Sequence, residues 1–274
     1  MAERKRNESG VLTERKRCGR VEDVNAYLMT EREKGIMAIL TERGTVSVPE
    51  VAEKFEVSEV TARSDLKGLE EKGLLSRTRG GAVPVVNRGI LERQSERLEE
   101  KSRIAKAAAE LVRDGDVVMI EAGTTTALIA RYLSGRDVHV VTNSMLAFNY
   151  ARGNPAVQVT VTGGEFRKET ESMVGPLALD TLARMNVRWA FVGTDGFSVE
   201  KGMTTHLLEG AEIVRAMKSH AKETVLVADS TKYGKAGFAS VLPLAEVDLI
   251  ITDSGIGNDA VKAMKKLGIE VRVV

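Results

Sequence analysis

The chain has 274 residues, which is long enough for two domains with a sizeable core. Its 40 basic and 39 acidic residues give a net charge of +1, which excludes a polycationic nucleic-acid coat. One cysteine, Cys18, excludes an intrachain disulfide and a cysteine metal cage, and three scattered histidines lack the spacing of a metal site: His139, His206 and His220.

The N-terminal segment has no feature of a membrane or secreted protein. It lacks the apolar core of a signal peptide, and no apolar run in the chain is long enough for a membrane helix. We therefore expect a cytoplasmic protein with no membrane partner and no cofactor or metal. Residues 1–29 are charged and poor in apolar side chains, which predicts a flexible tail. The alternative is a basic arm that adds contacts to DNA phosphates.

Residues 30–84 predict a winged helix-turn-helix domain, the shape that places one helix in a DNA major groove. The first helix is predicted at 31–44. Ser47 and Glu50 form a capping box at the start of the second helix, and a third helix is predicted over 58–73, ending at a glycine. An alternating hairpin around two glycines then forms the wing.

The third helix has two distinct faces. Ala62, Leu66 and Leu69 form its inner stripe. The other face and the wing carry side chains that read bases or hold phosphates, and these are the candidate DNA-binding residues: Ser58, Thr61, Arg63, Ser64, Lys67, Arg77 and Arg79. A helix pair with surface arginines can also be a plain helical hairpin, but the wing favours a DNA reader. Because the domain is near charge balance, we expect a homodimer or homotetramer on a double-stranded operator.

A polar segment at 85–97 predicts a linker, and residues 98–274 predict a second domain of a different class. It opens with an alanine-rich helix over 98–112. Short runs rich in valine and isoleucine then alternate with helical stretches, and they begin at Val117, Val138, Val157, Trp189, Thr224, Asp248 and Ile269. This alternation predicts an open, mostly parallel α/β sheet with helices on its faces.

Polar, glycine-rich loops follow five of these runs, and the carboxyl ends of parallel strands meet at one edge of a sheet. Residues 123–126, Gly-Thr-Thr-Thr at a helix start, offer backbone N–H groups and hydroxyls to an anion. Lys232 adds a cation, and Asn143 and Asp195 can bind ligand hydroxyls. These loops favour a phosphorylated sugar or polyol, with purely structural turns as the alternative.

From about Thr30 to its C-terminus the chain resembles DeoR-type bacterial transcriptional regulators. The first domain resembles the family through VSEVTARSDLKGLEEKGLLSRTRGGA. The second does so through EAGTTT, VVTNS, VTGGEFR, MVGPLALDTL, FVGTDGF, GMTTH, VADSTKYGKAGF and DLIITD. The resemblance implies a fold related to sugar-phosphate isomerases and coenzyme A transferases. It also implies a repressor of carbohydrate-catabolism genes controlled by a phosphorylated sugar.

The matching blocks imply which residues contact the effector. They are Gly123, Thr124, Thr125, Thr126, Asn143, Gly163, Gly164, Asp195, Gly196 and Lys232. Glu121 is a further candidate, although the family usually has the shorter Asp at the start of this loop. In the DNA-binding helix, Ser64 follows Arg63 where the family commonly has a second arginine, which predicts a different base preference.

The largest departure from the family pattern lies in GMTTHLLEGAEIVRAM. Leu207 and Gly210 stand where the family usually offers Asn and Glu, and that Glu corresponds to a ligand-contacting carboxylate, the general base of the related isomerases. Glu209 and Glu212 are close by, but a shift of one or two residues turns a helical side chain by roughly 100–200°. His206 is a candidate to fill part of the gap. No catalytic residue is expected, and an isomerase-like enzyme with an appended DNA-binding domain is the alternative.

Overall fold

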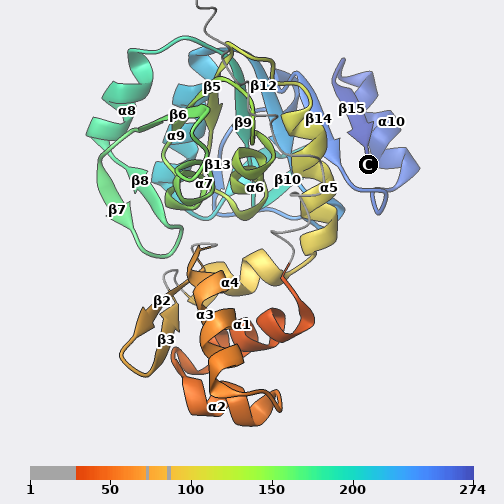
Figure 1. Ribbon diagram of the computed structural model, residues 1–274. Coiled ribbons are helices and arrows are strands. Elements are labelled where there is room, and N and C mark those ends of the chain that lie inside the picture. Colours follow the sequence, from red (N-terminus) through yellow and green to blue (C-terminus); the bar gives the residue numbers. More distant parts are fainter. Residues whose placement is uncertain (1–28, 72–73, 85–87) are drawn as a thin grey trace, which may run out of the picture.

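The computed structural model describes residues 29–71, 74–84 and 88–274, and in Figure 1 it has two lobes. The smaller lobe holds the elements before residue 85, and the larger one is built on the long sheet. The predicted tail up to residue 28, with Cys18, and the predicted helix stop at Gly73 lie outside the described residues.

The smaller lobe has the predicted winged helix-turn-helix topology. Its elements are α1 (Glu31–Arg43), β1 (Val46–Ser47), α2 (Val48–Lys54), α3 (Glu59–Glu71), β2 (Leu75–Thr78) and β3 (Gly81–Pro84). The capping box of Ser47 and Glu50 is confirmed, and Thr30 and Glu33 form a second one on α1. The strands pair in the order β1-β3-β2. A Cβ at Gly81 would overlap the carbonyl of Val46, so glycine is required where β3 meets β1.

The larger lobe contains a seven-stranded parallel sheet in the order β15-β14-β12-β9-β4-β5-β6. Its strands are β4 (Val117–Ile120), β5 (Val138–Thr142), β6 (Val157–Val161), β9 (Val187–Val192), β12 (Ala221–Val227), β14 (Leu249–Thr252) and β15 (Glu270–Val273). Each corresponds to one of the seven predicted apolar runs. The predicted fold class is therefore confirmed.

Helices cover both faces of this sheet, as Figure 1 shows. One face carries α5 (Leu98–Ala109), α6 (Thr124–Tyr132) and α7 (Met145–Ala151), and the other carries α8 (Pro176–Ala183), α9 (Leu208–Ser219) and α10 (Asn258–Lys266). Val225 and Val227 pack into the core of the first face, and Leu226 packs into that of the second. This two-sided burial explains why the strands are continuous apolar runs.

Several elements were not predicted from the sequence. They are a hairpin of β7 (Glu165–Arg167) and β8 (Ser172–Val174), an antiparallel sheet of β10 (Gly196–Ser198), β11 (Gly202–Thr205) and β13 (Ala239–Ser240), and two 3₁₀ turns, Ser230–Lys232 and Leu244–Glu246. Helix α4 (Arg88–Ser95) lies within the segment predicted as a linker and contacts both α1 and α6. None of the helices in the described ranges is long and apolar enough to cross a membrane.

Candidate effector pocket and DNA-binding surface

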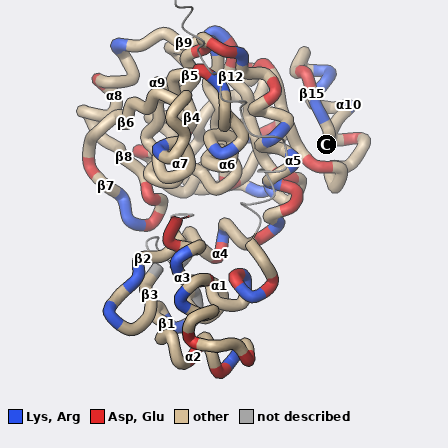
Figure 2. The backbone as a smooth tube through the Cα atoms, in the orientation of Figure 1, with Lys and Arg blue, Asp and Glu red and all other residues tan. Residues whose placement is uncertain are grey.

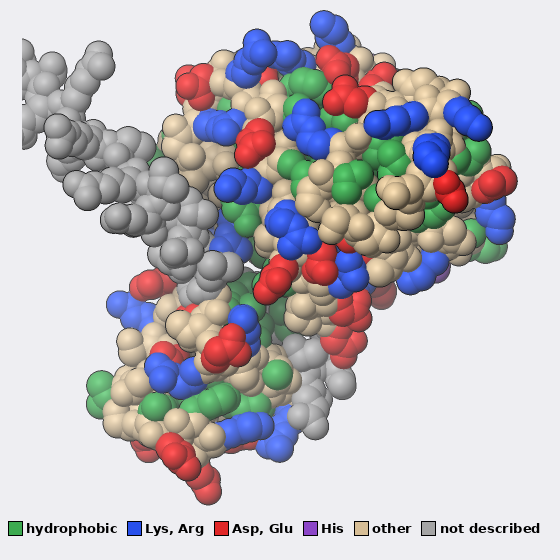
Figure 3. Space-filling view, turned by 90° about the vertical axis from the view of Figure 1, so that its right-hand side faces the viewer, with side chains coloured by type: hydrophobic (Ala, Val, Ile, Leu, Met, Phe, Trp, Pro, Cys, Tyr) green, Lys and Arg blue, Asp and Glu red, His purple; other side chains and the backbone are tan. Residues whose placement is uncertain are grey.

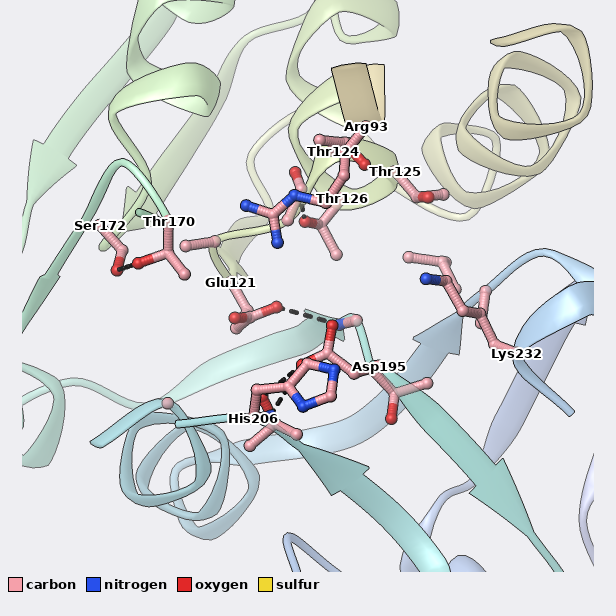
Figure 4. Close-up of a pocket in the computed structure, with 18 of the residues that line it drawn as sticks. Arg93, Glu121, Thr124, Thr125, Thr126, Thr170, Ser172, Asp195, His206 and Lys232 are labelled. Atoms are coloured by element: carbon pink, nitrogen blue, oxygen red, sulfur yellow. Dashed lines mark hydrogen bonds between the residues drawn. The ribbon is translucent and has the colours of Figure 1, made fainter. Parts of the chain in front are cut away.

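A cavity of about 330 Å³ lies at the carboxyl ends of the central strands, where the polar loops were predicted to converge. Its volume is in the range of small-molecule sites. It brings together nine of the predicted effector residues: Glu121, Gly123, Thr124, Thr125, Thr126, Asn143, Asp195, His206 and Lys232. Figure 4 shows several of these side chains directed into the cavity from different loops.

Three predicted effector residues lie outside the lining of this cavity: Gly163, Gly164 and Gly196. Gly163 and Gly164 have φ values of 70° and 115°, which side chains rarely adopt. A Cβ at Gly164 would also overlap the carbonyl oxygen of Val174, and one at Gly196 would overlap the backbone of Lys235. The structure thus explains Gly163 by its backbone conformation, and Gly164 and Gly196 by close backbone packing. These constraints explain the sequence pattern without a ligand contact.

The start of α6 presents backbone donors to the cavity. Its N-cap is Gly123, which has no side chain to accept hydrogen bonds from the first turn. The hydroxyl of Thr126 donates to the carbonyl oxygen of Gly123 at 3.0 Å, which ties the loop to the helix. The N–H groups of the first turn and the positive end of the helix dipole therefore have no side-chain cap, an arrangement that favours a negatively charged group.

Glu121 lies under this helix end. Its Oε2 accepts a hydrogen bond from the backbone N–H of Gly193 at 3.1 Å. Burial raises the pKa of its carboxyl to about 8, and the negative charge of Asp195 adds to the rise, while the Gly193 hydrogen bond opposes it. At neutral pH the carboxyl is mostly protonated, so it can donate a hydrogen bond to a ligand oxygen without repelling an anion.

Asn143 lines the same cavity, and its side-chain oxygen is buried and unpaired. The residue is 2% exposed, and its Nδ2 donates to the carbonyl oxygen of Met173 at 3.1 Å. Its Oδ1 is buried and has no hydrogen-bond partner. An unsatisfied buried acceptor is costly, so this atom marks a position where a ligand hydroxyl would bind favourably.

Asp195 and His206 line the cavity on the side across from the start of α6. Oδ2 of Asp195 accepts from the hydroxyl of Thr205 and from the backbone N–H of His206, each at 2.9 Å. Asp195 therefore fixes the loop that precedes α9 as well as facing the cavity. His206 is exposed, and Figure 4 shows its ring beside Asp195.

Helices α4 and α5 and the turn between them contribute cations that the sequence did not predict for the site: Arg93, Arg97 and Lys101. Arg97 contacts carboxylate oxygens of Asp253 at 3.0 Å and Asp229 at 3.4 Å. The ammonium of Lys101 donates to the carbonyl oxygen of Arg93, and burial lowers its pKa. The one signal in the sequence that could have indicated these cations is their spacing of four residues. In a polar stretch the same spacing is also typical of a solvated linker.

The departures from the family pattern are in the cavity wall. Leu207 and Gly210 both line it, whereas Glu209 instead contacts Arg167 at 2.8 Å and Glu212 is exposed. The prediction that the two neighbouring glutamates do not replace a carboxylate at 210 agrees with this geometry. A Cβ at Gly210 would have no neighbour nearer than 3.8 Å, so the cavity has space there.

The predicted DNA-binding side chains lie on α3 and the wing, where Figure 2 shows several basic residues. Ser58 caps α3 by accepting a hydrogen bond from the N–H of Thr61 at 3.1 Å. Three of the predicted cations contact acidic neighbours in the same lobe: Arg63 with Glu59 at 2.6 Å, Lys67 with Glu71 at 3.6 Å, and Arg77 with Glu70 at 2.7 Å. Ser64 and Arg79 are exposed.

These ion pairs explain how a nearly neutral domain can present cations locally. Exposed pairs are worth little, so DNA phosphates can replace the carboxylates at small cost. Figure 3 shows one face of the molecule on which basic and acidic side chains alternate over both lobes. Among the residues that the structure describes, no continuous basic surface is visible on that face.

Comparison with known families matches both lobes. The model of the DeoR C-terminal sensor domain matches residues 96–254, and that of the DeoR-like helix-turn-helix domain matches residues 32–87. A putative aga operon transcriptional repressor of Escherichia coli O157:H7 is 32% identical over 252 residues, covering 89% of this chain and 94% of the relative. The HTH-type transcriptional repressor GlcR of Bacillus subtilis strain 168 is 33% identical over 248 residues, covering 89% and 95%.

Solved structures show weaker similarity. Ribose 5-phosphate isomerase A from Methanocaldococcus jannaschii has a TM-score of 0.36 and 22% identity, and covers 48% of this chain and 53% of its own. The sorbitol operon regulator SorC from Klebsiella pneumoniae has a TM-score of 0.38 and 11% identity, and covers 86% and 100%. Similarity at this level does not bear on the ligand or the activity of this chain.

Proposed function

This chain belongs to the DeoR family of transcriptional regulators, and from that premise we propose that a phosphorylated sugar in the sensor cavity controls its binding to DNA. Both of the relatives described above are named as repressors, which supports repression as the sign of regulation. In this proposal, the occupancy of the sensor cavity sets the affinity of α3 and the wing for an operator.

One observation carries the choice of effector: the uncapped start of α6 and Asn143, whose buried Oδ1 has no partner, line one cavity. The first fits an anionic group, and the second fits a hydroxyl. The protonated carboxyl of Glu121 supplies another polar contact beside them without adding charge. A small molecule with a phosphate at one end and hydroxyls along its length satisfies all three groups.

We propose that dimers or tetramers present pairs of α3 helices to repeated half-sites. In each copy, Arg63, Ser64 and Lys67 face the groove, and Arg77 and Arg79 contact the backbone or the minor groove. The exposure of these side chains on α3 and the wing supports this assignment. Effector binding changes DNA affinity only if it favours one arrangement of the paired domains over another.

The enzymatic alternative needs a positioned base. Gly210 lines the cavity at the position where the family pattern would offer a carboxylate, and Glu209 is held by Arg167. Both observations favour a sensor over an isomerase. Turnover of any aldose or ketose phosphate by the pure full chain would support the enzyme instead.

The direct test is a thermal-shift screen of the full chain against matched sugars and sugar phosphates. A ligand that binds only the folded state raises the melting temperature by mass action. We expect a rise with at least one phosphosugar that is absent with its unphosphorylated form. Replacing Asn143 by Leu, which removes the hydroxyl acceptor, should reduce that rise. Equal shifts with and without the phosphate would refute the anion site.

A further inference from the structure

Helix α4 is the first element after the winged helix, and it contacts both lobes. It packs against α1 of the DNA-binding domain and against α6, whose first turn forms the anion site. Ile90 and Leu91 are 3% and 5% exposed, so the helix is held by buried apolar contacts. Ile90 and Arg93 line the cavity. The segment that joins the two domains is therefore also part of the pocket.

Arg93 brings a positive charge to this pocket. Its guanidinium donates to the carbonyl oxygen of Glu169 at 2.7 Å and to that of Gly89 at 3.3 Å. Both recorded partners are neutral, whereas Arg97 contacts two buried carboxylates. In Figure 4 the guanidinium of Arg93 points into the cavity from the side of Thr124, at the start of α6. Its charge is thus well placed to compensate an anion.

We infer that Arg93 binds the anionic group of the effector together with the first turn of α6, so that α4 is a wall of the effector site. This inference rests on the proposed function, because it assumes an anionic ligand in the cavity. Arginine suits the role, since its planar donors match the oxygens of a phosphate. Lys232 lines the same cavity and brings a further cation to it.

The consequence is a short physical route from effector to DNA. An anion held between α4 and α6 stabilises the arrangement in which the two helices are close. Helix α4 also packs on α1, so a change in how α4 lies on α6 is passed to the DNA-binding domain. The coupling requires only that the effector bind the two arrangements with different affinity.

The test compares three variants of the full chain: Arg93→Gln, Arg93→Lys and the control Arg103→Gln. Arg103 is exposed on α5 and does not line the cavity. Binding is measured by calorimetry with inorganic phosphate and with a panel of pentose and hexose phosphates. Losing a charge-assisted hydrogen bond predicts affinity about 10- to 100-fold weaker for Arg93→Gln. Arg93→Lys should recover part of it, and Arg103→Gln should match the unmodified chain.

Hydrogen exchange on the unmodified chain tests the same inference without any substitution. The best-binding probe should slow exchange in two segments, the first turn of α6 and α4. Slowing at α6 alone, with unchanged affinity in Arg93→Gln, would overturn the role of Arg93 and leave the proposed effector site intact. If no probe binds or protects either segment, the proposed function fails, and this inference fails with it.

Discussion

The two functional regions place their charged groups in opposite environments. In the DNA-binding domain, the Arg63 and Glu59 side chains are 57% and 48% exposed, and their pair lies within one helix. In the sensor domain, Arg97 is 34% exposed but contacts Asp253, which is 2% exposed and comes from a distant strand end. The first surface is ready to exchange its partners for phosphates, whereas the second depends on its internal partners for stability.

The largest expected effect is on the stability of the sensor domain. Arg97→Gln leaves Asp229 and Asp253 buried without their cation, which we expect to lower the free energy of unfolding by about 2–3 kcal/mol. The value is below that of a fully buried pair because solvent screens the partly exposed guanidinium. Urea unfolding of the full chain measures it. Arg63→Gln is the matched control, and an equal loss in both variants would contradict the contrast between the regions.

The next effect concerns DNA recognition. Arg63→Ala should lower affinity for a duplex selected from a random pool by the full chain, and it should relax preference at one base pair by about 1–3 kcal/mol. Fluorescence anisotropy with single-base variants of that duplex measures both quantities. Arg103→Ala, which removes the same charge away from α3, serves as control. Unchanged affinity together with unchanged preference would remove Arg63 from the DNA-reading surface.

The same contrast explains what could be predicted from the sequence. The DNA-binding residues are close together in the chain, and local patterns such as the capping box at Ser47 and the stripe through Ala62 and Leu66 fixed their placement. The seven strands could also be predicted, because both faces of the sheet are buried and each strand is a continuous apolar run in the sequence. Arg93 was not predicted as a cavity residue. Its place in the cavity wall depends on where α4 packs, which is a long-range property.

The glycines show a limit of the same patterns. Gly163, Gly164 and Gly196 were predicted as effector contacts but lie outside the cavity lining, and a positive φ at the first two and close backbone contacts at the last two explain glycine there without a ligand. A glycine in a loop after a strand indicates a tight backbone, and only the structure tells whether that backbone faces a ligand. Asn143, in contrast, lines the cavity.

A smaller effect is the pH dependence that Glu121 gives to the sensor domain. Burial raises the pKa of its carboxyl from 4.5 to about 8, so within that window the folded chain holds a proton that the unfolded chain has released. Stability then decreases as pH rises, by up to about 1.4 kcal/mol per pH unit. Glu121→Gln should remove this slope while keeping an acceptor for Gly193.

Urea unfolding at several pH values between roughly pH 5 and 8 measures that slope. The exposed Glu212→Gln is the matched control, because it removes a carboxylate that does not line the cavity. A slope that survives in Glu121→Gln would show that the carboxyl is already ionised in the folded protein at neutral pH.

The smallest expected effect is on the DNA affinity that the wing contributes. Glu70 accepts hydrogen bonds from the side chain and the backbone N–H of Arg77, and these bonds lower the pKa of its carboxyl. Glu70→Gln should weaken the hold on Arg77 and strengthen DNA binding by at most a few fold, since solvent screens an exposed ion pair. Anisotropy at low salt measures the change. Weaker binding would mean that Glu70 positions Arg77 for its contact.

The measurement that tests the central claim most directly is the DNA affinity of the full chain with and without a sugar phosphate. The duplex is the one selected by the full chain, and each sugar phosphate is compared with its unphosphorylated form at constant ionic strength. We predict that at least one phosphosugar changes the affinity several-fold, while its unphosphorylated form does not. An affinity that no phosphosugar changes, although one binds the sensor cavity, would contradict control of DNA binding by that cavity.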